Sequence, residues 1–251
     1  MIDTHIHADA RSSEDFKEMY LSGIDCAITC SYYPYKIDAE NILLNHLNRI
    51  LEYDTLRASQ YGLDLKVALG IHPTNSIENP QMIFDEMYNW IENKQIVAIG
   101  EIGLEDLTET EIDIFKKQLD IADETNSKVI IHTPRKKKLE VLKVILDIVP
   151  QHLDESQAVI DHVNQEVIGE VIDRNYMLGL TVQPQKLDVD GAIDILDNFG
   201  FDNFLLNSDM SNKPSDHLSV AKTIRELSRL GYKKSSIDKI SHRNASDYFK
   251  I

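Results

Sequence analysis

Met1-Ile2-Asp3-Thr4-His5-Ile6-His7 is the stretch on which the interpretation of this chain depends. Apolar and polar residues alternate through it, which is the period of a β-strand. His5 and His7 therefore project from the same side of one strand, about 6–7 Å apart along it. Two imidazoles in this arrangement can bind one cation without backbone strain. The alternative is a polar strand end with one buried, hydrogen-bonded histidine, and the rest of the chain decides between the two.

Seven further β-branched, apolar runs follow this strand, separated by amphipathic segments. The expected strands are residues 2–7, 26–31, 66–72, 96–104, 128–133, 158–163, 176–182 and 204–210. Their starts lie about 29 residues apart, close to the spacing in a (β/α)8 barrel of about 250 residues. The alternative, an open doubly wound sheet, normally has a glycine-rich first turn, whereas the first turn here is Ala8-Asp9-Ala10-Arg11-Ser12. The pattern predicts an α/β, TIM-like barrel.

The expected helices have apolar residues at helical spacing. They are residues 38–61, 82–91, 139–149, 165–174, 192–199, 218–230 and 237–249, with one more around Phe115, Leu119 and Ala122. In the long segment 38–61, the predicted apolar stripe consists of Ile42, Leu43, Leu47, Ile50, Leu51 and Leu56. Ser12-x-x-Asp15 and Thr108-x-x-Glu111 are typical of capping boxes.

Composition is consistent with one domain over residues 1–251. Hydrophobic residues make up 42% of the chain and charged residues 27%, which suits a soluble protein with a large core. No apolar run approaches the roughly 18 residues of a membrane span. Met1 leads directly into the first strand, which leaves no room for a signal peptide and predicts a cytoplasmic protein. Cys26 and Cys30 lie about 13 Å apart on one strand, too far for a disulfide, and are expected to be core thiols.

The net charge of −16 bears on partners. Proteins that grip duplex nucleic acid usually have a basic face, so stable duplex binding is not expected. Local capture of one phosphate by a few residues or metal ions remains compatible with this charge.

Polar residues of the types that bind metals lie at the ends of the predicted strands. His72 ends the third, Glu101 the fourth, His132 the fifth, His162 the sixth and Asp209 the eighth. Catalytic groups of barrel enzymes lie at the carboxyl ends of the strands, where the loops converge. Together with the histidine pair of the first strand, these residues predict a metal site. The other histidines, His46, His152, His217 and His242, are expected to be exposed to solvent.

The chain resembles the TatD-like metal-dependent hydrolases, within the wider amidohydrolase-type barrel superfamily. The matching pieces are Asp3-Thr4-His5-Ile6-His7, Gly70-Ile71-His72-Pro73, Gly100-Glu101-Ile102-Gly103-Leu104, Ile131-His132, His162, Ser208-Asp209 and Asn244-Ala245 followed by Phe249. They occur in the family's order and spacing from the first residue to the last helix. The string from Gly100 to Leu104 is the most specific of them.

The resemblance implies one or two divalent metal ions, most simply Zn²⁺, with Mn²⁺, Ni²⁺, Fe²⁺ or Mg²⁺ as alternatives. It assigns His5, His7 and Asp209 to one ion, His132 and His162 to a second, and Glu101 to both. It also implies hydrolysis of phosphodiesters by a metal-activated hydroxide, with exonuclease-like action on DNA and single-stranded DNA ends as partners. Asp209 and Glu101 would be the catalytic carboxylates, with Asp209 transferring the proton.

Three departures from the family pattern leave the substrate open. Val163-Asn164-Gln165-Glu166 follows the sixth-strand histidine, Asn207-Ser208-Asp209-Met210-Ser211 surrounds the last aspartate, and Arg135 lies one residue later than usual. The alternatives are therefore a barrel that hydrolyses an amide, a lactone or another small-molecule bond, and a metal-binding scaffold without turnover.

Two predicted substrate contacts each have a structural alternative. His72 either contacts substrate or is a buried histidine hydrogen-bonded beside Pro73. Arg135-Lys136-Lys137-Lys138 is either a solvated charge run or a phosphate-binding element above the metals. Arg135 is the best candidate in that run for a bidentate grip on phosphate.

Overall fold

Parallel strands and helices alternate along the chain in the computed structural model, which describes residues 1–37 and 39–251. The strands are β1 (Ile2–Ile6), β2 (Cys26–Cys30), β3 (Asp64–Ala68), β4 (Ile99–Gly103), β5 (Val129–His132), β6 (Ala158–Ile160), β7 (Met177–Thr181) and β8 (Phe204–Asn207). The helices are α1 (Ser13–Leu21), α2 (Glu40–Arg49), α3 (Thr55–Ser59), α4 (Gln81–Glu92), α5 (Glu109–Glu124), α6 (Lys138–His152), α7 (Ile168–Val171), α8 (Val189–Phe199), α9 (Ser219–Arg229), α10 (Lys234–Asp238) and α11 (Asn244–Phe249).

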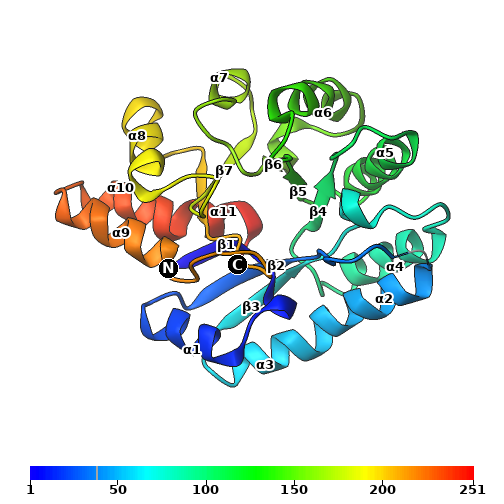
Figure 1. Cartoon of the computed structure of the whole chain (residues 1–251), viewed down its shortest axis with the longest axis horizontal. Coiled ribbons are helices and arrows are strands. Elements are labelled where there is room, and N and C mark those ends of the chain that lie inside the picture. The colour runs from blue at the N-terminus through cyan, green and yellow to red at the C-terminus, as the bar shows by residue number, and fades with distance from the viewer. Residues whose placement is uncertain (38) are drawn as a thin grey trace.

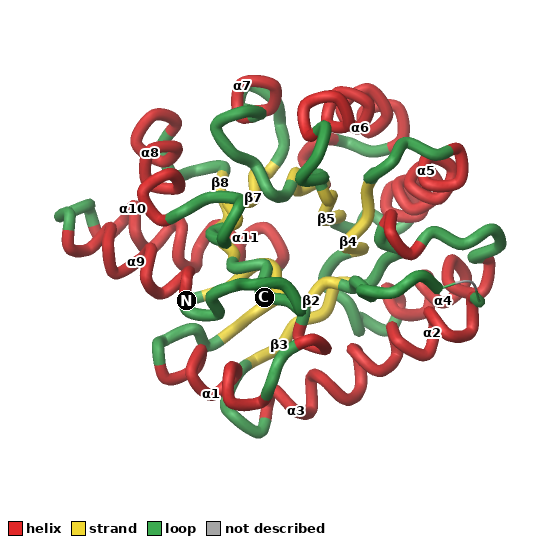
Figure 2. The backbone as a smooth tube through the Cα atoms, in the orientation of Figure 1, coloured by secondary structure: helices red, strands yellow, loops and turns green. Residues whose placement is uncertain are grey.

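The strands close into a ring. β1, β2 and β3 pair in sequence order, as do β4 to β8. Single parallel bridges, between Ala68 and Ala98 and between Ile6 and Met210, connect these two groups at both junctions. The strands surround a central space and the helices lie outside them (Figures 1 and 2). The fold is the predicted (β/α)8 barrel, which brings the carboxyl ends of all these strands to one face.

Each expected strand is found and is shorter than predicted. The strand expected at 66–72 begins earlier, at Asp64, and ends at Ala68, so His72 lies in the loop after it rather than at its last position. The expected strand 158–163 ends at Ile160 in the structure, and His162 takes a left-handed conformation with φ of 61°. The expected helix 165–174 shrinks to α7 because few residues remain before β7 begins. In the segment 38–61, Asp38 lies outside the described residues, and a π-helical turn over Ile50–Asp54 joins α2 to α3.

Two local predictions need correction. Ile42 and Leu56 were expected in the apolar stripe of the long helix, but both side chains are exposed to solvent. Leu43, Leu47 and Ile50 of the same stripe are buried as predicted. The Ser12 and Asp15 capping box is complete. At α5 only half of the box forms, because the Glu111 carboxylate accepts from the preceding loop backbone instead of from Thr108.

The core has two parts. The larger part lies between the strands and the surrounding helices and includes Phe16, Trp90 and Phe115. The smaller part includes Ile2, Ile28, Cys30, Ala68, Ala98, Ile130, Val159 and Leu205 from the strands and their ends, with Ala245 and Phe249 of α11. The C-terminal helix therefore packs on residues of the barrel wall. Within the described part of the chain, no helix combines the length and apolarity that crossing a membrane would require.

Gln118 of α5 fixes the segment that carries His72. Its side chain is fully buried, and its amide nitrogen donates to the Ile71 carbonyl at 3.2 Å. The Ile71 amide donates in turn to Gln118 Oε1 at 2.7 Å. Both backbone groups lie just beyond β3, where strand pairing no longer satisfies them. A helix side chain therefore takes the place of a sheet partner.

Gln118→Leu should lower the free energy of unfolding by about 2–4 kcal/mol, because each buried backbone group left without a partner costs about 1–3 kcal/mol. Chemical denaturation followed by circular dichroism measures this. Gln60→Leu, on an exposed side chain, is the control and should change stability by less than about 0.5 kcal/mol. Equal stability of both variants would show that the two hydrogen bonds between Gln118 and Ile71 do not stabilise the fold.

Candidate metal centre

The residues expected at the strand ends converge on one cavity. His7, His72, Glu101, His132, His162 and Asp209 all line it, and His5 lies directly beneath them. The cavity has a volume of about 470 Å³. All of these side chains are buried except His132, which is partly exposed. The convergence follows from the barrel, since the residues are distant in sequence and share only their position at the carboxyl ends of strands.

Glu101 lies at the centre of the imidazoles. Its Oε1 is 2.8 Å from His132 Nδ1 and 3.1 Å from His162 Nε2. Its Oε2 is 3.4, 3.6 and 3.7 Å from the Nε2 atoms of His5, His72 and His7. The surrounding imidazoles outweigh burial and hold the pKa of this carboxyl well below its usual range. Glu101 is therefore an ionised, buried carboxylate in contact range of five imidazole rings.

Hydrogen bonds on the outer side fix the tautomers of two first-strand histidines. His7 Nδ1 donates to the Cys30 carbonyl at 2.9 Å, and a carbonyl can only accept. His5 Nδ1 bonds to the carboxylate of buried Asp161. In the neutral ring, each Nε2 then keeps a lone pair directed at the cavity. Such outer partners are typical of metal-binding histidines.

His162 has partners on both ring nitrogens. Its Nδ1 is 2.7 Å from the Thr181 hydroxyl, and its Nε2 is 3.1 Å from Glu101 Oε1. Because the hydroxyl can donate or accept, the ring can donate from Nε2 to Glu101 or, with a cation bound, donate from Nδ1 to Thr181 and turn the Nε2 lone pair to the cation. Burial lowers the pKa of His162 to about 4, so the ring is neutral at physiological pH.

These donors fit a divalent cation. The Nε2 atom of His5 is buried and has no hydrogen-bond partner among the described residues. Ligand atoms within 4.8 Å of one another form three groups: His5, His7 and Asp209; His5, Glu101 and His162; and His72, Glu101 and His132. Neutral imidazoles and carboxylates are the ligands that Zn²⁺ and similar ions take. The assignment of His132 and His162 to one ion stays a prediction, although both rings contact the same oxygen of Glu101.

His72 has the opposite tautomer. Its Nδ1 accepts from the Thr74 backbone amide at 3.1 Å, so the neutral ring must carry its proton on Nε2. Burial lowers the pKa of this ring well below its ordinary value. His72 therefore presents an N–H, rather than a lone pair, to the cavity, which suits contact with an anionic oxygen. His72 is buried and hydrogen-bonded beside Pro73, as the structural alternative expects, and it also lines the cavity, while its contact with substrate stays a prediction.

Asp161 was missed by the sequence interpretation. Its Oδ2 bonds to His5. Its Oδ1 accepts from the His162 amide at 2.8 Å and from Asn207 Nδ2 at 2.9 Å. Burial opposes its ionisation, but His162 and His5 lower its pKa. Its position just before His162 was the only available clue. The left-handed backbone at His162 allows the side chains of Asp161 and His162 to face the site together.

Lys186 was also missed. The turn from Gln183 to Lys186, after β7, carries its ammonium to within 2.5 Å of Asp209 Oδ2. Asp209 Oδ1 is 3.1 Å from His7 Nε2. Burial opposes ionisation of Asp209, but Lys186 and the histidines keep its pKa well below the usual range. No sequence pattern around Lys186 indicated this contact.

Glu105, in the loop after β4, is a third residue that the sequence interpretation missed. Its carboxylate is 2.8 Å from His132 Nε2, while the other nitrogen of that ring faces Glu101. Two carboxylates raise the pKa of His132 despite its burial. Glu105 lies four residues after Glu101, in the loop beyond β4, and that proximity was its only clue.

The basic run divides into three environments. Arg135 and Lys136 line the cavity, and Arg135 Nη2 donates to Gln183 Oε1. Lys137 is exposed. Lys138 is buried and donates to the Thr133 and His162 carbonyls, so the interpretation as a solvated run is wrong for it. Burial lowers the pKa of Lys138 to about 7.

The remaining histidines and cysteines need one correction. His46 was expected to be exposed, but it is buried and bonds to the Tyr32 carbonyl at 3.2 Å. His242 is exposed as expected, and His152 and His217 are partly exposed. Cys26 and Cys30 are free thiols.

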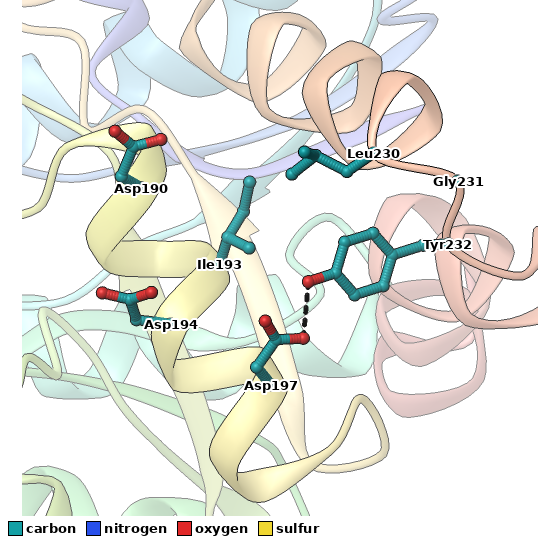
Figure 3. A pocket seen from close by; sticks show the side chains of 7 residues that line it. All are labelled: Asp190, Ile193, Asp194, Asp197, Leu230, Gly231 and Tyr232. Atoms are coloured by element: carbon teal, nitrogen blue, oxygen red, sulfur yellow. Dashed lines mark hydrogen bonds between the residues drawn. The ribbon is translucent and has the colours of Figure 1, made fainter.

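A second hollow lies away from this cluster, between α8 and the end of α9 (Figure 3). Asp190, Asp194 and Asp197 of α8 line it with Leu230 and Tyr232, and the Tyr232 hydroxyl donates to Asp197 at 2.5 Å. None of the residues lining the hollow is an imidazole or a cation. The hollow therefore lacks both the imidazoles and the phosphate-binding cations of the barrel mouth, which is the better candidate site.

Known proteins resemble the chain over its full length. The sequence profile described as TatD related DNase matches residues 2–250. A metal-dependent hydrolase of Methanocaldococcus jannaschii is 36% identical over 253 residues, covering 100% of both chains. The TatD-like protein of Archaeoglobus fulgidus superposes with a TM-score of 0.85 at 27% identity, covering 100% of both chains. A phosphotriesterase homology protein of Escherichia coli, at 15% identity and a TM-score of 0.71, covers 99% of this chain and 98% of its own and shares the fold.

Purified protein should contain up to two divalent ions per chain, and His5→Ala/His7→Ala should lose at least one, because both Nε2 lone pairs face the cluster. Mass-spectrometric metal analysis measures this. His242→Ala, on an exposed side chain, should keep the wild-type content. Full metal content in the double variant would place the ions elsewhere.

Gly179 of β7 leaves room for Asp161: a Cβ built at this position would lie 1.9 Å from Asp161 Oδ1. Gly179→Ala should therefore displace the carboxylate from His5. We expect a loss of about 1–3 kcal/mol in stability and about 10–100-fold in metal affinity. Calorimetric metal titration tests this, with Gly169→Ala as the control, since nothing lies within 4 Å of a Cβ there. Wild-type affinity in Gly179→Ala would show that Asp161 does not position His5.

Proposed function

The chain belongs to the TatD related DNase family, and from this premise we propose that it is a metal-dependent phosphodiesterase that acts on single-stranded DNA from an end. The observation that carries the proposal is the group of imidazole lone pairs around Glu101, with the unpartnered His5 Nε2 among them. Family membership and the 36% identical hydrolase support metal-dependent hydrolysis. The choice of a phosphodiester rests on the cationic residues of the cavity.

We propose Zn²⁺ or a similar divalent ion as the cofactor, because imidazoles outnumber carboxylates among the donors. His5, His7 and Asp209 would hold one ion, and His132, His162 and Glu101 a second. Bound there, the ions would supply hydroxide at neutral pH and polarise a phosphoryl oxygen. The fixed tautomers mean that little reorganisation is needed for binding.

The protein's own groups then orient the substrate. His72 donates from Nε2 to a non-bridging oxygen of the reacting phosphoryl group, and the Arg135 guanidinium contacts a phosphate of the substrate beyond that group. Asp209 takes the proton of the attacking water and returns it to the leaving oxygen. Lys186 and the neighbouring histidines stabilise the ionised form of Asp209, so the protonated carboxyl would hold its proton only briefly before returning it.

The surface beside the cavity fits an extended single strand. The Tyr32 ring lines the cavity and packs on His7 and His72, with centroids 5.2 and 5.0 Å away. A groove of about 980 Å³ adjoins the cavity and is lined by Tyr32, Tyr33 and Tyr35. Stacking of bases on aromatic rings is a common means of binding single strands without sequence preference.

A small-molecule substrate is the second candidate. Glu105 and Asp106 line the same cavity and would repel a polyanion on their side. A neutral lactone or amide would not meet that repulsion, and the same metal cluster could hydrolyse it.

A substrate panel tests the proposal directly. Metal-loaded protein is assayed with single-stranded oligonucleotides, bis(p-nitrophenyl) phosphate and a set of lactones. We expect cleavage of the first two and not of the third. Turnover of lactones alone would replace the proposal with the second candidate, and loss of all turnover at full metal content would indicate a scaffold.

Asp209→Asn should lose about 10²–10⁴-fold in kcat on the best substrate, or about 3–5 kcal/mol of transition-state stabilisation. Asn is nearly isosteric but cannot accept a proton at neutral pH. Rates are compared at saturating metal, because Asp209 is also a proposed ligand. Asp194→Asn, in the hollow of Figure 3, is the control and should match wild type. Activity of Asp209→Asn within about threefold of wild type would exclude proton transfer by Asp209.

A further inference from the structure

We propose that Arg135, Lys136 and Lys213 form a phosphomonoester subsite beside the metal cluster. The preferred substrate would then carry a terminal phosphate in addition to the bond that is cleaved. This inference rests on the proposed function and narrows its substrate class. It concerns residues that the metal cluster does not use.

Positive charge is scarce in this chain, and most of the guanidinium groups are neutralised. The sequence has 42 acidic and 26 basic side chains. The arginines that form ion pairs with carboxylates are Arg11, Arg49, Arg57, Arg174, Arg229 and Arg243. Among the described arginines, Arg135 and Arg225 alone lack such a partner, and of these two only Arg135 lines the metal cavity. Most lysines of the chain are unpaired, so Lys136 and Lys213 are distinguished by their position at this cavity.

Three such cations line the metal cavity. Among the described residues, no carboxylate oxygen lies within 4.0 Å of the charged nitrogens of Arg135, Lys136 or Lys213. Lys186 lines the cavity too, but its charge is engaged by Asp209. Arg135 and Lys136 follow β5, while Lys213 follows β8, so separate loops bring the charges to one cavity.

Arg135 is held in place without being neutralised. Its Nη2 donates to the neutral Gln183 amide oxygen. Gln183 is buried, and its own nitrogen donates to the Asp209 carbonyl. The guanidinium is thus tied to the backbone at the end of β8 and keeps most of its five N–H donors free. A fixed guanidinium with free donors is well suited to bidentate binding of phosphate.

More unpaired cations line the cavity than are needed to balance the charge of a phosphodiester. A phosphodiester carries one negative charge, and the metal cluster would face the reacting one. A phosphomonoester carries about −1.5 to −2 at pH 7, which matches the additional unpaired cations. Glu105 and Asp106 come from the loop after β4, which neighbours β5 in the ring, so acidic residues border the cationic loop on one side. A polyanion that crosses the whole barrel mouth would be repelled by these carboxylates, whereas a chain end would only have to reach the cations.

Matched chromogenic substrates test the subsite. One pair is thymidine 5′-(p-nitrophenyl phosphate) with and without a 3′-phosphate, and the other is thymidine 3′-(p-nitrophenyl phosphate) with and without a 5′-phosphate. We expect the phosphorylated member of one pair to have a kcat/KM at least about 10-fold higher, mainly through KM, because charged hydrogen bonds contribute about 1.5–3 kcal/mol each. Oligonucleotides with and without the same terminal phosphate show whether the group belongs to a DNA end or to a small molecule.

Arg135→Gln and Lys213→Gln should each reduce this preference. Lys137→Asn, which removes an exposed neighbouring charge and tolerates the left-handed backbone at φ of 51°, should keep it. A preference below about twofold in both wild-type pairs, with all four compounds hydrolysed, would overturn the subsite but not the proposed function.

If none of the compounds is hydrolysed by metal-loaded protein, the proposed function fails, and binding decides the subsite separately. Calorimetry then compares thymidine 3′,5′-bisphosphate with each thymidine monophosphate. At least about 10-fold tighter binding of the bisphosphate, lost in Arg135→Gln, supports the subsite. Equal dissociation constants would overturn it.

Discussion

The structure of the barrel mouth depends on one buried carboxylate, Glu101, with five imidazole rings in contact range. An isolated ionised carboxylate in the interior is strongly disfavoured, so its charge has to be balanced by cations or by N–H donors. Histidine at the ends of several strands can do either, depending on its tautomer. The tautomers are set from behind, by groups that do not face the cavity. The groups behind the histidines therefore determine which imidazole nitrogens can bind a metal ion.

That lower layer connects strands that are adjacent in the ring. Asp161, after β6, binds His5 of β1 and accepts from Asn207 of β8, and it fits only because Gly179 of β7 has no side chain. The Cys30 carbonyl at the end of β2 orients His7. A metal ion at the mouth would thus be held by ligands whose positions are fixed by the closed ring. Closure of the barrel therefore contributes to metal affinity, because it fixes the positions of the ligands.

The sequence was sufficient to predict the fold and the histidines and carboxylates at the strand ends, because both follow from local patterns. The period of two places His5 and His7 on one face, and the end of each apolar run marks where the next polar residue meets the mouth. Lys186 and Glu105 could not be predicted, since their contacts depend on loop conformations rather than on periodicity. Asp161 was missed because a left-handed residue follows it, which alternation does not reveal. Burial of His46 against the Tyr32 carbonyl likewise depends on a contact between two distant segments.

Anomalous diffraction from crystals grown with Zn²⁺ or Mn²⁺, recorded at the metal absorption edge, tests the central claim most directly. The account predicts a peak in coordination distance of His5 Nε2, His7 Nε2 and Glu101, with both rings still donating from Nδ1 to Asp161 and Cys30. A second peak near His132 and His162 is expected at high metal concentration. Strong peaks elsewhere on the protein, with none beside Glu101 and His5 at saturating metal, would contradict it.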